Sequence, residues 1–189
     1  MKTVAAPPTP PRGATIWPIS VAAYHTLGEA GLVPERTELL YGFVYQKIPK
    51  SPYHCYLLTR LLRLLQAVVP AGCLLRSEQP ITCEDSEPEP DISVVRGAEL
   101  DFRFAHPKTA ELVIEICVSS HEYDRSKLRA YASAGVREVW LVLAPEKQIE
   151  VWTRREDGEL TQKTFGPDGT VPCGAVPEFK LDLTSLFAA

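Results

Sequence analysis

One stretch of the chain has the apolar spacing of a long amphipathic helix. Between residues 53 and 69, the leucines at 58, 61, 62 and 65 recur at the i, i+3, i+4, i+7 positions that share one helical face. Thr59, Arg63 and Gln66 fall on the opposite face, where we expect contact with solvent. Pro70 and Gly72 follow, and they are typical of a helix end.

Two shorter helices are predicted on either side of this stretch. The first begins at Ser20, a residue type that caps helix N-termini, and extends to about residue 30, before a glycine and a proline. The second covers about residues 124–134, with Leu128, Tyr131 and Ala132 facing inward and a glycine at its end.

Most other apolar positions fit strands. Residues 36–48 (RTELLYGFVYQKI) indicate a strand pair turned at Tyr41-Gly42, and three further strands are expected at about 73–82, 91–96 and 111–118. EVWLVL and QIEVWT form a hairpin around residues 144–147. The core order is therefore helix, three strands, helix, strand, followed by additional C-terminal strands. It predicts an α/β (α+β) fold with a central mixed sheet flanked by helices.

Length and charge limit the possible classes of protein. At 189 residues we expect a single domain over residues 17–189, preceded by a flexible proline-rich tail over residues 1–16. The formal net charge of -4 argues against a protein that coats nucleic acid by bulk electrostatics, so any nucleic-acid contact must be local.

Cysteine usage favours a reducing, cytoplasmic location. The five cysteines are odd in number, widely spaced and without a CxxC pair, so we expect free thiols rather than disulfides. A zinc site at His54 and Cys55 would need two more ligands at suitable spacing, and the sequence offers none. No apolar run approaches the roughly 20 residues needed to span a membrane.

Two acidic residues stand out against apolar surroundings. Asp91 opens the strand ISVV, and Glu115 lies inside the apolar run LVIEIC, where alternation places Val113, Glu115 and Cys117 on one face. Burying an unpaired carboxylate costs several kcal/mol. If the two strands are neighbours, about 4.8 Å apart, both carboxylates can reach one ion, and oxygen ligands suit Mg²⁺.

Each acid also has a purely structural explanation. Asp91 can cap the turn after Pro90, and Glu115 can pair with Lys127 or Arg129. Taken singly, the structural and functional explanations are about equally strong. Together, the two acids favour a metal site.

These segments resemble the Uma2 family, which belongs to the PD-(D/E)XK restriction-endonuclease-like superfamily. The resemblance rests on motifs in a fixed order over residues 36–187: Glu38-Leu39, Gly42, His54, SEQPITCEDSEPEPDISVV, ELVIEICVSS, the series Asp124, Lys127 and Tyr131, then Gly135-Val136, REVWLVL and VPEFKLDLTSLF.

The resemblance implies a magnesium-dependent nuclease, with Mn²⁺ as an alternative ion. Asp91 and Glu115 correspond to the two motif acids, and the carbonyl of Ile116 corresponds to a backbone metal ligand. Cys117 stands where the motif has its lysine, and a thiol cannot replace an ammonium. Lys127 is the implied catalytic substitute, whereas the alternative is an ordinary helical pair with Asp124.

Four further residues are weaker site candidates. Glu38 matches an upstream acid of the family, although Tyr41 and Phe43 stand where the family tends to have more acids, which weakens the case for a second ion. Gln79 is expected on a strand beside the site, with an ordinary edge glutamine as the alternative. His54 and Arg63 can contact nucleic acid, or can simply begin a helix and solubilise its face.

The leading interpretation is a metal-dependent endonuclease that acts on DNA, with RNA as a second possible substrate. The runner-up is a binding or regulatory module that keeps the nuclease fold after losing efficient chemistry. A third class is another metal-assisted hydrolase on the same fold. A homodimer is also predicted, from superfamily members that cut two strands and from the apolar hairpin carrying Trp140 and Trp152.

Overall fold

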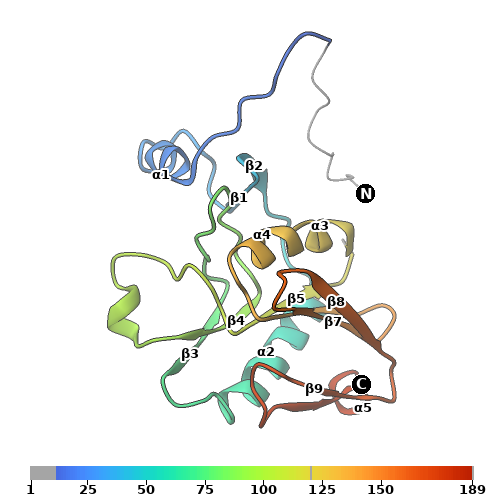
Figure 1. Ribbon diagram of the computed structural model, residues 1–189. Coiled ribbons are helices and arrows are strands. Elements are labelled where there is room, and N and C mark those ends of the chain that lie inside the picture. Colours follow the sequence, from blue (N-terminus) through green and yellow to red (C-terminus); the bar gives the residue numbers. More distant parts are fainter. Residues whose placement is uncertain (1–11, 120, 189) are drawn as a thin grey trace.

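A six-stranded sheet forms the centre of the computed structural model, which describes residues 12–119 and 121–188. The strand order is β3-β4-β5-β6-β7-β8, and helices cover both faces (Figure 1). Strands β5 (Leu112–Cys117) and β6 (Glu138–Leu143) are parallel, whereas the other neighbouring pairs are antiparallel. The predicted mixed sheet flanked by helices is confirmed.

The remaining elements extend this core. The other strands of the sheet are β3 (Cys73–Ser77), β4 (Ile92–Arg96), β7 (Gln148–Arg154) and β8 (Leu160–Phe165). Two small sheets pair β1 (Thr37–Leu40) with β2 (Phe43–Gln46), and β9 (Thr170–Pro172) with β10 (Lys180–Asp182). The helices are α1 (Val21–Glu29), α2 (Pro52–Gln66), the 3-10 helix η1 (Glu99–Phe102), α3 (His121–Ser126), α4 (Leu128–Ser133) and α5 (Leu183–Leu186).

Alternation along β5 divides the core into two layers. Ile114 and Ile116 point into the layer that contains α2 and the C-terminal segment. Val113 and Cys117 point into the layer under α4. Glu115 lies on the same face of β5 as Val113 and Cys117, so the predicted alternation of side chains along this strand is confirmed.

Helix α2 packs its leucines on the sheet. Ser51 caps its N-terminus by accepting a hydrogen bond from the backbone N–H of His54 at 3.2 Å. Leu57, Leu61 and Leu65 are fully buried, and the leucines at 58 and 62 are partly buried beside them. The helix was therefore predicted correctly, although Leu57 belongs to the buried stripe and the last turn ends earlier than expected.

The predicted helix over residues 124–134 is wrong in one respect, because it is divided into α3 and α4 at Lys127. The hydroxyl of Tyr41 accepts a hydrogen bond from the backbone N–H of Ala130 at 3.2 Å and donates to the carbonyl of Ser126. These two groups would otherwise bond to each other in a continuous helix. The Tyr41 hydroxyl thus inserts into the backbone ladder and interrupts it.

The strand predicted over residues 73–82 is also shorter, since β3 ends at Ser77. Glu78 has a left-handed backbone, with φ 55°, and Pro80 follows shortly after, so the strand cannot continue. In contrast, the predicted turn between β1 and β2 is confirmed. Tyr41 and Gly42 have φ values of 54° and 78°, as a tight hairpin turn requires.

The hairpin with Trp140 does not present the apolar surface on which the homodimer prediction relied. Trp140 is fully buried and stacks on Phe179, with ring centroids 5.5 Å apart. Trp152 is partly buried and donates to Glu150 at 3.1 Å. The predicted tail over residues 1–16 lies mostly outside the described residues. Among the helices that the structure describes, none is long and apolar enough to cross a membrane.

Candidate active site

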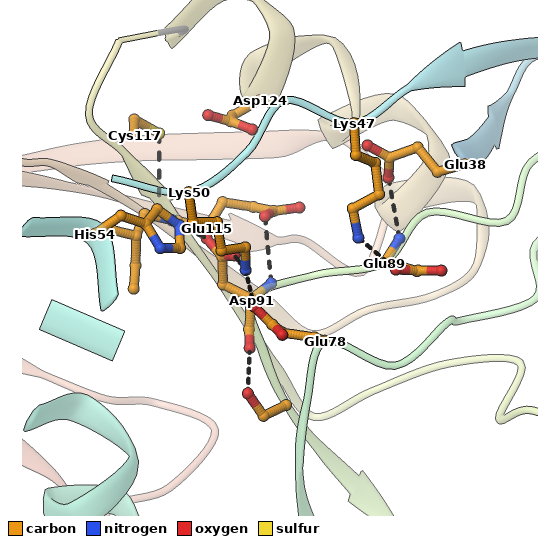
Figure 2. Close-up of polar contacts among 12 residues, drawn as sticks. Glu38, Lys47, Lys50, His54, Glu78, Glu89, Asp91, Glu115, Cys117 and Asp124 are labelled. Atoms are coloured by element: carbon orange, nitrogen blue, oxygen red, sulfur yellow. Dashed lines mark hydrogen bonds and ion pairs between the residues drawn. The ribbon is translucent and has the colours of Figure 1, made fainter. Parts of the chain in front are cut away.

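The predicted acids meet in a pocket of about 240 Å³. It lies where β1, the loop before α2, the start of β4, the end of β5 and α3 come together, and Figure 2 shows Asp91 and Glu115 side by side among its polar side chains. The ionisable side chains that line it are Glu38, Lys47, Lys50, His54, Glu89, Asp91, Glu115, Tyr123, Asp124 and Lys127.

Asp91 is buried and surrounded by hydrogen-bond donors. Its Oδ1 accepts from the ammonium of Lys50 at 2.6 Å, and its Oδ2 accepts from the backbone N–H of Ile116 at 2.7 Å and from Nε2 of His54 at 3.0 Å. Burial alone would raise the pKa of Asp91, but His54 and Lys50 outweigh it and lower the pKa to about 2. The carboxylate is therefore ionised, and the alternative of a simple turn cap does not describe these contacts.

Glu115 lies beside Asp91 because β4 and β5 are neighbours, with Ile92 opposite Ile114. Its Oε2 accepts from the backbone N–H of Asp91 at 3.4 Å, and its Oε1 accepts from the hydroxyl of Tyr131 at 2.6 Å. Burial raises the pKa of Glu115 to about 8, with neighbouring acids adding to the shift and Lys127 opposing it. Even beside Lys127, this carboxyl is therefore largely protonated at neutral pH, and a further cation would be needed to ionise it.

Lys127 supplies the cation closest to Glu115. The lysine is 3% exposed, and its Nζ lies 3.1 Å from Glu38 Oε1, 3.2 Å from Glu115 Oε1 and 3.8 Å from Asp124 Oδ1. Burial would lower the pKa of Lys127, but these acids raise it well above its ordinary value. The alternative of a solvated pair with Asp124 is wrong. Arg129 does not pair with Glu115 and instead lies over the ring of Tyr41.

Glu38 joins the cluster through β1. Its Oε1 accepts from the hydroxyl of Tyr123 at 2.6 Å, and its Oε2 accepts from the backbone N–H of Glu89 at 3.0 Å. Burial opposes ionisation, yet Lys127 and Tyr123 hold the pKa of Glu38 below its ordinary value. This acid therefore helps to fix the ammonium of Lys127 in the pocket.

His54 lines the acidic pocket, whereas Arg63 and Gln79 do not. His54 is buried against Asp91, and its Nδ1 has no hydrogen-bond partner among the described residues. Arg63 is exposed on α2. Gln79 is exposed in the loop after β3, where it accepts from Arg76 at 2.8 Å, so it does not lie on a strand beside the site.

Sequence reasoning missed two residues that contact the motif acids. Tyr131 was expected only as a core residue. It lies four residues after Lys127, a spacing that turns both side chains towards Glu115. Lys50 lies in the loop before α2, and nothing in the local pattern indicates that this loop reaches Asp91.

Cys117 is fully buried behind Glu115. Its thiol donates weakly to the carbonyl of Glu115, with sulfur and oxygen 3.9 Å apart. Burial raises the pKa of Cys117 far above its ordinary value, and nearby acids add to the effect. The residue at the motif lysine position is thus an uncharged group.

The carboxylates of the pocket are the type of ligand that a hard divalent cation binds, although they are not arranged around a common metal position. Among residues 12–119 and 121–188, no three histidine, cysteine or acidic side chains are grouped closely enough to hold an ion. Glu38, Glu115 and Asp124 nevertheless concentrate buried carboxylates around Lys127, the one buried lysine of the described residues, and Asp91 lies beside Glu115. Mg²⁺ prefers carboxylate oxygens as ligands. The ammonium of Lys50 pairs with one such oxygen, Oδ1 of Asp91.

Comparisons with known proteins agree with this fold. Residues 24–184 match the Uma2 family model, described as "Putative restriction endonuclease", so the chain belongs to the Uma2 family. The crystal structure of "a putative nuclease belonging to DUF820" from Anabaena variabilis is similar to this chain, with a TM-score of 0.75 at 20% identity, over 90% of this chain and 98% of that one. At this identity the likeness shows a shared fold. A comparison with curated protein sequences finds no match.

Proposed function

We propose that this protein is a magnesium-dependent endonuclease that hydrolyses phosphodiester bonds of DNA. The observation that carries the proposal is the shared pocket of Asp91, Glu115 and Lys127, which come from two adjacent strands and the break between two helices. The family description and the shared fold support a nuclease. The surplus of buried carboxylates over buried ammonium groups supports a divalent ion in the same pocket.

Asp91, Glu115 and the carbonyl of Ile116 are the proposed ligands, with Mn²⁺ able to replace Mg²⁺. When bound, such an ion lowers the pKa of an attacking water and neutralises charge on the phosphate. The protein prepares this chemistry by holding both carboxylates in fixed orientations. Tyr131 fixes Glu115 from one side, and the Ile116 N–H fixes Asp91.

Lys127 is the proposed substitute for the motif lysine, because Cys117 at the motif position carries no positive charge. Its ammonium is held against Glu115 by Glu38, so it lies at the edge of the two-acid site. There it can donate to a phosphate oxygen as negative charge develops in the transition state. Because the surrounding acids keep the ammonium protonated, it serves as an electrostatic stabiliser and not as a general base.

The binding-module alternative is favoured by one specific observation. Lys50, His54 and the Ile116 N–H already satisfy both oxygens of Asp91. A chain that no longer binds metal would be stable with this arrangement. In the enzyme, by contrast, an ion at Asp91 would compete with the ammonium of Lys50 for Oδ1.

Two further expectations belong with this proposal. The described cysteines are all free, which supports the reducing environment of the cytoplasm. The homodimer remains a prediction that rests on cutting both strands of a duplex. Neither expectation alters the chemistry of the pocket.

Metal titration calorimetry tests the proposal directly. Asp91→Asn and Glu115→Gln should each lose Mg²⁺ and Mn²⁺ binding, while Glu159→Gln, an exposed acid outside the pocket, should bind like wild type. Cleavage of labelled duplex and single-stranded DNA should disappear in the same two variants. Unchanged metal affinity in either variant would refute the shared site, and metal binding without any cleavage by wild type would favour the binding module.

A further inference from the structure

A second and larger hollow, of about 980 Å³, lies next to the acidic pocket. It is bounded by α1, by residues 33–37 and by the loop that follows η1. We call this hollow the side groove.

The side groove and the acidic pocket are neighbours that meet at Glu89. Thr37 lines the groove, and the next residue of β1, Glu38, lines the pocket. Glu89 lines both hollows, and its carboxylate pairs with Lys47. An extended chain that lies in the groove and passes Glu89 would therefore reach the two-acid site.

One wall of the side groove is both basic and aromatic. The segment 102–108 (FRFAHPK) carries Arg103, His106 and Lys108, and it contains no acid. Phe104 is 89% exposed on this wall, so it adds nothing to the core. The guanidinium of Arg103 lies over its ring, 4.9 Å from the ring centroid. A planar cation stacked on an exposed ring is a suitable platform for a nucleobase.

The wall is anchored on both sides of Phe104. The backbone N–H of Thr82 donates to the carbonyl of Pro107 at 2.9 Å, and Pro107 is buried. On the other side, the guanidinium of Arg76 lies over the ring of Phe102, 5.6 Å from its centroid. The exposure of Phe104 is thus imposed by a fixed backbone, and a fixed stacking surface loses little entropy when it binds.

The opposite wall carries charges of both signs. Glu29 and Glu35 lie there with His25 and Arg36. A polyanion in the side groove will therefore place its phosphates along the 102–108 wall, away from these two acids. This asymmetry also reconciles phosphate binding with the net charge of -4, since only one wall needs to be basic.

We propose that the side groove binds single-stranded DNA, with bases stacked on Phe104 and phosphates paired with Arg103 and Lys108, and that it leads the strand to Asp91. The choice of DNA rests on the proposed function. The choice of a single strand comes from the exposed ring, because a base can stack on a protein side chain only when it is not paired and stacked in a duplex. The substrate class is then an unpaired segment of DNA, such as a flap or a gap.

Fluorescence anisotropy of a labelled single-stranded oligodeoxynucleotide, measured at low salt with EDTA, tests the proposal without any cleavage. Phe104→Ala and Arg103→Ala should each weaken binding by about tenfold, the scale of losing one stacked base. Leu100→Ala, 79% exposed on η1, and Arg155→Ala, exposed beyond β7, are the matched controls and should bind like wild type. Equal affinity of Phe104→Ala and wild type, or tighter binding of duplex or RNA than of single-stranded DNA, would overturn the proposal.

Hydrolysis of bis(4-nitrophenyl) phosphate separates this proposal from the proposed function. This small phosphodiester has no chain to occupy the side groove, so Phe104→Ala should hydrolyse it at the wild-type rate. If wild type hydrolyses no phosphodiester but its binding of single-stranded DNA depends on Phe104, the groove stands and the nuclease assignment fails. If Phe104→Ala loses both binding and the small-substrate activity while its circular dichroism is unchanged, Phe104 acts on the catalytic pocket and the groove proposal fails.

Discussion

Replacing Lys127 by methionine should cost about 3 kcal/mol of unfolding free energy. Methionine keeps most of the apolar stem but removes the ammonium that lies within 4 Å of Glu38, Glu115 and Asp124. Leaving a buried charge without its partner costs about 3–5 kcal/mol. The lower end applies because the pKa of Glu115 is about 8 even beside Lys127, so this carboxyl is largely protonated at pH 7, and the charge left without its partner is mainly that of Glu38.

Urea unfolding followed by circular dichroism at pH 7 measures this cost. Wild type and Lys127→Met should each be unfolded in EDTA and again with Mg²⁺. The matched control is Lys163→Met, which replaces an exposed lysine on β8. In EDTA the unfolding free energy of the control should differ from that of wild type by less than about 0.5 kcal/mol. Mg²⁺ should restore more stability to Lys127→Met than to wild type, because a bound ion stabilises the folded state and the variant pocket has lost a positive charge.

Single-turnover cleavage completes the test of Lys127. If its ammonium stabilises the transition state, Lys127→Met should lose about 2–4 kcal/mol of that stabilisation while still binding metal. A stability cost below about 1 kcal/mol would show that Lys127 is not the buried counter-ion of this cluster. Wild-type cleavage rates in the metal-bound variant would remove the lysine from the chemistry and leave it a structural role alone.

Three smaller predictions concern other parts of the molecule. Tyr131→Phe removes the 2.6 Å donor to Glu115 and should cost about 1–3 kcal/mol in the same urea assay; a change within error would mean that water replaces the hydroxyl. Iodoacetamide at pH 7.5 should label exposed Cys55 well before Cys83 and Cys173, because burial raises the pKa of each of these two thiols to about 12; equal labelling rates by mass spectrometry would contradict this. Light scattering at micromolar concentration should report a dimer, and a monomer would count against the homodimer.

The two motif acids could be placed from the sequence because their positions depend on local rules. Strand alternation fixes the face of Glu115, and a proline before an apolar run marks the start of the strand that follows Asp91. The structure adds that these strands are neighbours, which the sequence left only as a condition. For the same reason the α2 leucine stripe was predicted almost completely.

The errors arise where residues far apart in sequence meet. The break at Lys127 depends on Tyr41, 89 residues before Ala130, and no helix propensity in residues 121–134 indicates it. Lys50 reaches Asp91 across 41 residues through a loop without regular structure. Gln79 was assigned to a strand because the left-handed backbone of Glu78 leaves no signature in residue type. Tertiary contacts, and not local patterns, decide these positions.

The C-terminal segment has a consequence for synthesis of the chain. Residues 171–187 supply much of the core layer beneath the sheet, including Val176, Phe179 and Leu186. Until this segment has been made, a nascent chain exposes the part of this core layer that α2 does not cover. We expect ribosome-bound chains that stop before residue 170 to recruit chaperones and to resist compaction, whatever the state of the acidic pocket. The protein therefore completes this fold only after residues 171–187 have been translated.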